Sequence, residues 1–369
     1  MYGIDRRRLA LLLLLPVLGI VAYIVGIVFV GSSEYRAAQE ALERRDFRQA
    51  RLHLEQYLEV RPGNLDARLL AAQTARRDGN FAASGQHLHI YAQQAGASTA
   101  LDLEQRLLRV QQGELGEIDA LQASIGAPPR SPRDFLIMEA LVESSLLAVK
   151  QKSIPGSAVA SNDADRATLL VDQWLQLRTG KIDKTQGFVW RGQLHESAND
   201  HAKARADYRQ ALELSPDSFQ ARMFLAVALF YPAPEEAAAH LQVLRARDPK
   251  NDHVRFSLAT VQRNLGQLKE AGQLLDELLN AHPDNIQYLI ERGYTALNAH
   301  QTDDAERFLR RALAVGPDAP DVHLALSGCL ELAGKTAEAK YYHERGRQLD
   351  NEFKQKRNEM KGKKAAFGN

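Results

Sequence analysis

The sequence is poor in cysteine and carries no excess of charge of either sign. Cys329 is the only cysteine among 369 residues, which excludes a disulfide within the chain and a zinc site made of several cysteines. Lysine and arginine number 47 and aspartate and glutamate 46, so the formal net charge is +1. A chain so balanced has no general electrostatic field that would gather nucleic acid, and we expect it to bind none.

The sequence also lacks a recognisable catalytic or cofactor-binding motif. His87 and His89 are two residues apart and point in different directions on a helix, and His195 is not followed by the second histidine of a zinc hydrolase. Gly334-Lys335-Thr336 imitates a phosphate-binding loop, but five residues separate Gly334 from Gly328 where four are required. We therefore predict a chain that is not an enzyme and has no catalytic residue, metal site, cofactor or small-molecule substrate.

One long hydrophobic run lies near the N-terminus. Residues 9–30 carry no charge, and a helix of this length spans about 33 Å, enough to cross a bilayer. Arg6, Arg7 and Arg8 precede the run, so residues 1–8 are expected in the cytoplasm and the rest of the chain outside, in the periplasm of a bacterium. Two alternatives stay open. The run could be a signal peptide cleaved near Ser32, and the basic residues from Arg44 onward weaken the assigned orientation.

A repeat with a period near 34 residues occupies much of the remaining chain. Each period contains apolar residues at helical spacing, a short polar turn, a second amphipathic helix and a proline that stops it. The prolines are Pro216, Pro249, Pro283 and Pro317, the recurring alanines are Ala204, Ala237, Ala271, Ala305 and Ala339, and the recurring small residues are Gly192, Ala226, Ala259, Gly293 and Ser327. This pattern predicts an all-α solenoid of stacked helix pairs.

These small residues and prolines resemble the tetratricopeptide repeat family. The resemblance implies a right-handed superhelix whose concave groove, lined by the first helix of each repeat, binds segments of other proteins. The combination of the repeats with the N-terminal run resembles bacterial envelope proteins in which one transmembrane helix carries a tetratricopeptide superhelix.

The repeats differ in quality along the chain. Residues 31–130 form N-terminal units of which the last is degenerate, and residues 131–184 form a degenerate helix pair with an inserted loop at 151–162. Residues 185–351 contain five units of good quality, and residues 352–369 form a basic tail that is expected to cap the last unit. The inserted loop could be a second binding element, and the basic tail could contact anionic headgroups or an acidic partner.

The expected partner-binding residues lie on the first helices of the five good units. An apolar stripe with polar edges would suit a helical or extended apolar segment of a partner protein. Partial packing of these side chains between the helices is the alternative. The expected groove residues are Val189, Gln193, Met223, Val227, Phe230, Phe256, Arg263, Ile290, Tyr294 and Leu324.

Together these patterns predict a membrane-anchored scaffold or adaptor that binds protein partners in its groove. The resemblance to envelope proteins implies a role in envelope assembly, secretion or export at the bacterial inner membrane. A receptor that faces the cytoplasm remains an alternative, and a secreted or enzymatic protein is a more remote one.

Overall fold

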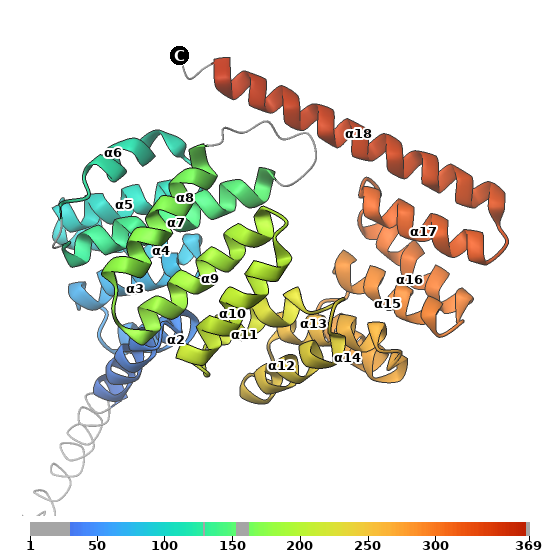
Figure 1. Ribbon diagram of the computed structural model, residues 1–369, viewed down its shortest axis with the longest axis horizontal. Helices are drawn as coiled ribbons and strands as arrows, with labels where there is room; N and C mark the ends of the chain where they lie inside the picture. Colours follow the sequence, from blue (N-terminus) through green and yellow to red (C-terminus); the bar gives the residue numbers. More distant parts are fainter. Residues whose placement is uncertain (1–29, 128–129, 153–161, 367–369) are drawn as a thin grey trace, which may run out of the picture. The chain divides into compact units, whose positions relative to one another are not determined.

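The computed structural model describes residues 30–127, 130–152 and 162–366, and in these ranges the regular elements are helices without any strand. The all-α prediction is therefore confirmed for this part of the chain (Figure 1). The chain divides into two compact units, residues 1–148 and residues 149–369.

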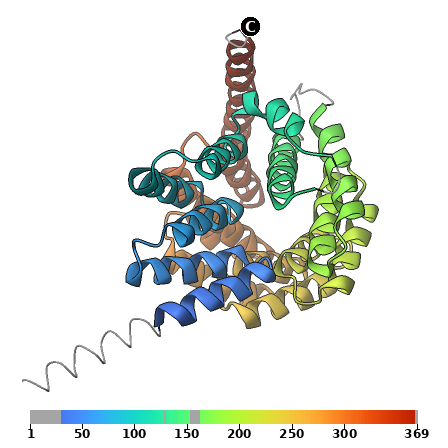
Figure 2. The same cartoon turned by 90° about the vertical axis from the view of Figure 1, so that its left-hand side faces the viewer.

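The first unit holds a helix over residues 30–43 and the elements up to most of α7. These are α2 (Phe47–Val60), α3 (Leu65–Arg77), α4 (Phe81–Ala95), α5 (Thr99–Gln111), the short 3-10 helix η1 (Leu115–Glu117), α6 (Ile118–Ala123) and α7 (Pro132–Lys152). The second unit continues with α8 (Asn162–Leu177), α9 (Lys181–Ser197), α10 (His201–Leu214), α11 (Phe219–Ala228), α12 (Pro234–Arg247), α13 (Asp252–Asn264), α14 (Leu268–Ala281), α15 (Ile286–Asn298), α16 (Thr302–Val315), α17 (Pro320–Leu332) and α18 (Thr336–Ala366). Figure 2 shows the helices from α9 to α14 stacked side by side along a curved path.

None of the helices in residues 30–127, 130–152 and 162–366 combines the length and the apolar character that a bilayer crossing requires. The expected span at residues 9–30 lies outside the described residues except for Val30. Most of the expected inserted loop at 151–162 lies outside them as well, because α7 ends at Lys152 and α8 begins at Asn162.

The prolines and helix caps set the boundaries of the repeats. Pro216, Pro249 and Pro283 each come two residues after a helix ends and three residues before the next helix begins. The residue before each new helix caps it, because the side chains of Ser218, Asn251 and Asn285 accept hydrogen bonds from backbone N–H groups three residues on. Proline stops one helix and the cap starts the next, which fixes the length of each unit.

The recurring small residues lie where the two helices of a unit cross. Ala204, Ala237 and Ala271 have no solvent exposure. A Cβ atom on Gly293 would lie only 2.8 Å from the Leu309 side chain, and one on Gly192 would overlap the ring of Tyr208. The crossing helices therefore approach too closely for a larger side chain, as the repeat pattern predicts.

Basic side chains join some consecutive repeats. Arg68 donates a hydrogen bond to the Pro62 carbonyl oxygen, and Arg222 donates one to the carbonyl oxygen of Pro216. In the last repeat, Nε2 of His323 lies 2.7 Å from the Pro317 carbonyl oxygen. These side chains satisfy backbone acceptors at the end of the preceding repeat, where no helical partner is present.

The last repeat ends differently from the others. Asn351 stands where the earlier repeats have proline, and α18 runs for 31 residues from Thr336 to Ala366 without a break. Its first half packs against α17, and the rest extends beyond it (Figure 1). Without a proline the helix continues, so residues 352–366 prolong α18, and the capping role expected of the basic tail stays a prediction.

Candidate functional site

Three of the expected groove residues present apolar surface to solvent. Val227 on α11, Tyr294 on α15 and Leu324 on α17 are 41%, 36% and 37% exposed. Phe230 and Phe256 are half-buried. Exposed apolar side chains on the first helices of several repeats are a feature of surfaces that bind other proteins.

Four other expected groove residues are buried between the helices. Val189 packs with Ala211 and Ala221, and Met223 belongs to the larger core around α12 and α13. Ile290 is 7% exposed and Gln193 is 6% exposed. These side chains contribute to packing in the structure and offer little surface to a partner.

The contacts of Phe256 and Arg263 explain why much of the stripe is covered. The ring of Phe256 lies 5.2 Å from the ring of Tyr288, which belongs to the first helix of the next repeat. Arg263 forms an ion pair of 2.6 Å with Glu291 on that same helix. Each first helix therefore covers part of the preceding one, and only the side chains beside this contact stay exposed.

The charges around Tyr294 are mainly acidic. Partial burial, with Asp321 and Glu291 nearby, raises the pKa of the Tyr294 phenol, while Arg263 acts in the opposite direction. The phenol is neutral at physiological pH and can donate a hydrogen bond. This part of the surface combines an aromatic side chain with carboxylates.

Three further residues of α17 are exposed that the repeat pattern did not predict as groove residues. Leu332 is 74% exposed, and Glu331 and Gly328 are exposed on the same helix. The repeat period contained the signal, because Leu332 follows Leu324 at a spacing of two helical turns and thus shares its face. Within the described residues no further first helix packs on α17, which a single repeat pattern does not reveal.

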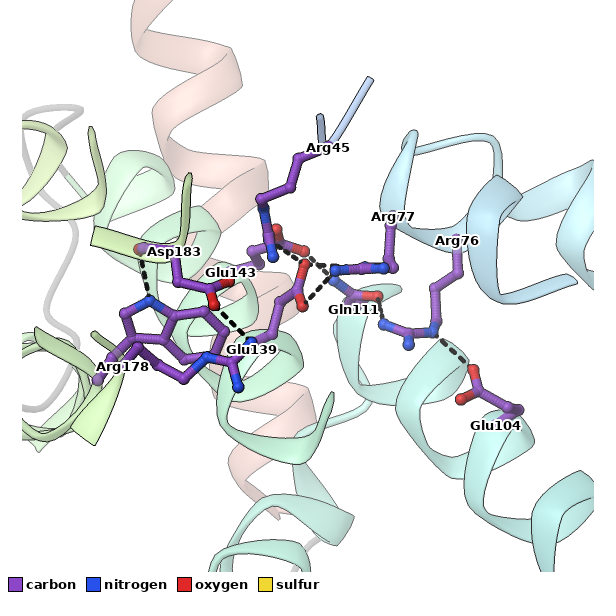
Figure 3. A network of polar contacts seen from close by, with 10 residues as sticks. Arg45, Arg76, Arg77, Glu104, Gln111, Glu139, Glu143, Arg178 and Asp183 are labelled. Atoms are coloured by element: carbon purple, nitrogen blue, oxygen red, sulfur yellow. Dashed lines mark hydrogen bonds and ion pairs between the residues drawn. The ribbon is translucent and has the colours of Figure 1, made fainter. Parts of the chain in front are cut away.

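A buried polar network lies in the first unit (Figure 3). Arg77 donates two hydrogen bonds of 2.9 Å to the carboxylate of Glu139 on α7, and Arg45 donates one of 2.5 Å. Both guanidinium groups also lie over the ring of Phe47, Arg77 at 4.0 Å from its centroid. The turn of the first repeat and the end of α3 are joined in this way to α7.

The second part of the network links α3, α5 and α7 (Figure 3). Arg76 donates to Glu104 at 3.0 Å and to the amide oxygen of Gln111 at 2.8 Å. The amide nitrogen of Gln111 donates to Glu143 at 2.5 Å. One chain of hydrogen bonds therefore runs from Glu104 to Glu143.

The two carboxyls on α7 have opposite pKa shifts. Burial favours the neutral form of Glu139, but Arg45 and Arg77 outweigh it and hold its pKa far below the ordinary value. Burial and the neighbouring Glu139 charge raise the pKa of Glu143. Perturbed carboxyls can mark functional sites, but here they are bound by arginine and glutamine of the same unit, so we assign the network a structural role.

No group of three or more His, Cys, Asp or Glu side chains suited to a metal ion occurs in the described part of the chain. Cys329 is buried, and burial raises the pKa of its thiol. A buried thiol with a raised pKa is a poor nucleophile.

Comparisons with known proteins identify the repeats. Sequence models described as Tetratricopeptide repeat match residues 35–98, 186–218, 233–291 and 290–345. A search of curated proteins returned no match.

Several solved structures are similar to parts of the chain. MamA MSR-1 is 20% identical over 46% of this chain and 98% of its own, with a TM-score of 0.37. MamA AMB-1 is 22% identical over 44% of this chain and 98% of its own, with a TM-score of 0.36. A thermophilic tetratricopeptide repeat protein of Thermus thermophilus is 21% identical over 45% of this chain and 91% of its own, with a TM-score of 0.40.

The helix pairs, the small residues at their crossings and the matched segments, which together cover more than half of the sequence, lead to one conclusion. The chain belongs to the tetratricopeptide repeat family.

Proposed function

We propose that the protein is an adaptor that holds a partner protein on the exposed side chains of its second unit. Tetratricopeptide repeats support a protein-interaction scaffold in general. The observation that carries the proposal is the row of exposed apolar side chains Val227, Tyr294 and Leu324 on the first helices α11, α15 and α17; on α13, between α11 and α15, Phe256 is half-buried. Acidic groups beside Tyr294 supply polar contacts at the edge of this row.

The anchor is part of the same proposal. Residues 9–30 form an uncharged run long enough to cross a bilayer, and Arg6, Arg7 and Arg8 precede it. The run would hold the adaptor at the inner membrane of a bacterium with its repeats in the periplasm. There it would gather partners for envelope assembly, secretion or export.

The binding surface is tested by replacing Tyr294. The Tyr294→Asp variant places a charge in the middle of the apolar row, and we expect at least a tenfold loss of the partner recovered after crosslinking in native membranes. The matched control is Val243→Asp on α12, because Val243 is 44% exposed and lies on a second helix. Equal recovery from the Tyr294 variant and the unmodified protein would contradict the proposed surface.

The anchor and its orientation need separate experiments. Alkaline phosphatase fused after Asn369 should be active if the repeats are periplasmic, and the protein should stay with the membrane in alkaline carbonate. An inactive fusion on a membrane-bound protein would favour the receptor that faces the cytoplasm. A mature N-terminus near Ser32 would identify a cleaved signal peptide.

A further inference from the structure

The last repeat that the structure describes carries a helix face on α17 that is only partly covered, because Leu324 packs beside Gly346 of α18 and no further first helix packs on it within the described residues. Leu324, Gly328 and Leu332 follow one another at single-turn intervals, so they share one face of the helix. Leu324 is 37% exposed, whereas Ile290, at the same place one repeat earlier, is 7% exposed. A Cβ atom on Gly328 would have no atom within 4 Å, so there is open room between the two leucines.

The earlier repeats show what covers this face. In the repeat that starts with α13, Phe256 packs against Tyr288, and Arg263 pairs with Glu291, both on α15. Tyr288 and Glu291 are three residues apart, so one face of α15 supplies an aromatic contact and a charge. Arg76 and Glu104, at the equivalent places of the first unit, form the same kind of pair at 3.0 Å.

In α17 the same places are held by different residues. Leu324 stands where Phe256 stands, and Glu331 stands where Arg263 stands, each 68 residues later. A covering helix must therefore present an apolar or aromatic side chain to Leu324 and, three residues on, a basic side chain to Glu331. The covering helix must therefore carry a positive charge at the place where α15 carries the negative charge of Glu291.

The tail of the chain does not meet this requirement. Continued by one more period, the repeat would place Lys356 against Leu324 and Glu359 against Glu331. The first residue is charged where an apolar one is needed, and the second has the same charge as its neighbour. The tail instead prolongs α18 as an unbroken helix.

We propose that the α17 face, defined by Leu324, Gly328, Glu331 and Leu332, binds an amphipathic helix of another protein with the pattern apolar–x–x–Lys/Arg. The partner helix would pack on α17 as α15 packs on α13. This surface shares Leu324 with the row that carries the proposed function, but Glu331 and Leu332 lie outside that row, so a substitution at Glu331 tests the α17 face separately.

The probe is a peptide taken from the chain itself. The segment 286–298, held helical by a staple on its outer face, carries Tyr288 and Glu291 in the required spacing. With Glu291→Lys the peptide has the pattern that the α17 face should bind. The unchanged peptide is the comparison, because it differs only in carrying a negative charge at that position. Binding of both to the full-length protein in detergent is measured by fluorescence anisotropy.

We expect the Glu291→Lys peptide to bind up to about fivefold more tightly than the unchanged one, the effect of one exposed ion pair. In the protein variant Glu331→Lys the preference should reverse. The control Glu344→Lys changes an exposed carboxylate on α18 and should leave the preference unaltered.

Three results would overturn the proposal. They are the same affinity for both peptides, no binding of either peptide, and a preference that persists in Glu331→Lys. A concentration-dependent dimer that Glu331→Lys abolishes would assign this face to a second copy of the chain and would also overturn it.

Discussion

Replacing one partner of the buried ion pair between Arg76 and Glu104 tests how much an unpaired buried charge destabilises the first unit. Their side chains are 1% and 2% exposed, and the two groups lie 3.0 Å apart. Glu104→Gln removes the negative charge and leaves the guanidinium of Arg76 buried beside a neutral amide. Breaking a buried pair on one side costs about 3–5 kcal/mol, and we expect about 3 kcal/mol because the amide still accepts a hydrogen bond.

The equivalent pair in the second unit serves as the control. Arg263 and Glu291 hold the same places in their repeats, but their side chains are 18% and 11% exposed. Partial hydration lowers the cost of an unpaired charge, so Glu291→Gln should cost about 1 kcal/mol. The two substitutions are chemically identical, and burial is the main difference between the sites.

Hydrogen exchange with mass spectrometry is the suitable assay, because repeat proteins open locally and a single unfolding transition is not assured. Peptides from α3 and α5 report the opening free energy near Glu104. The double variant Arg76→Met with Glu104→Leu should recover most of the opening free energy that Glu104→Gln loses, since an apolar pair of similar volume leaves no buried charge. If Glu104→Gln costs no more than Glu291→Gln, or if the double variant is as unstable as the single one, the reasoning is wrong.

Two further predictions concern packing and pH. Gly293→Val places methyl groups against Leu309, whose nearest atom would lie 2.8 Å from the new Cβ, and should lower the opening free energy of α15 and α16 by about 1–3 kcal/mol in hydrogen exchange. Gly272→Ala, where the nearest atom is 3.6 Å away, should not lower it. The pKa of Glu143 rises to about 7 in the folded protein, so the folded state binds more protons than the unfolded state, and stability is lost as the pH rises from about 4.5 through 7. Exchange protection of α7 should fall over this range, and Glu143→Gln should flatten the profile.

The repeat period predicted much of the second unit correctly. Prolines, alanines and glycines located the helix ends and the helix crossings, because those places allow few residue types. The period could not separate exposed from covered groove positions. Ile290 and Leu324 occupy the same place in their repeats, and only the presence of a following helix makes the first one buried.

The network in the first unit was not predictable from the sequence. Arg45 and Glu139 are 94 residues apart, and no repeat spacing connects them. The roles of Arg68, Arg222 and His323 were not predictable either. In the structure these side chains bind the carbonyl oxygen of a proline six residues earlier, a role that depends on backbone geometry and not on side-chain type alone.

The central claim, that exposed side chains on the first helices of the second unit hold a protein partner, is tested most directly by site-specific photo-crosslinking. A photoreactive phenylalanine analogue is placed at Tyr294 or, for comparison, at Val243, in the full-length protein in its native membrane. We predict a discrete crosslinked protein from position 294 that position 243 does not give, although both sites have similar exposure. The same products from both positions, or crosslinks from position 243 alone, would contradict the account.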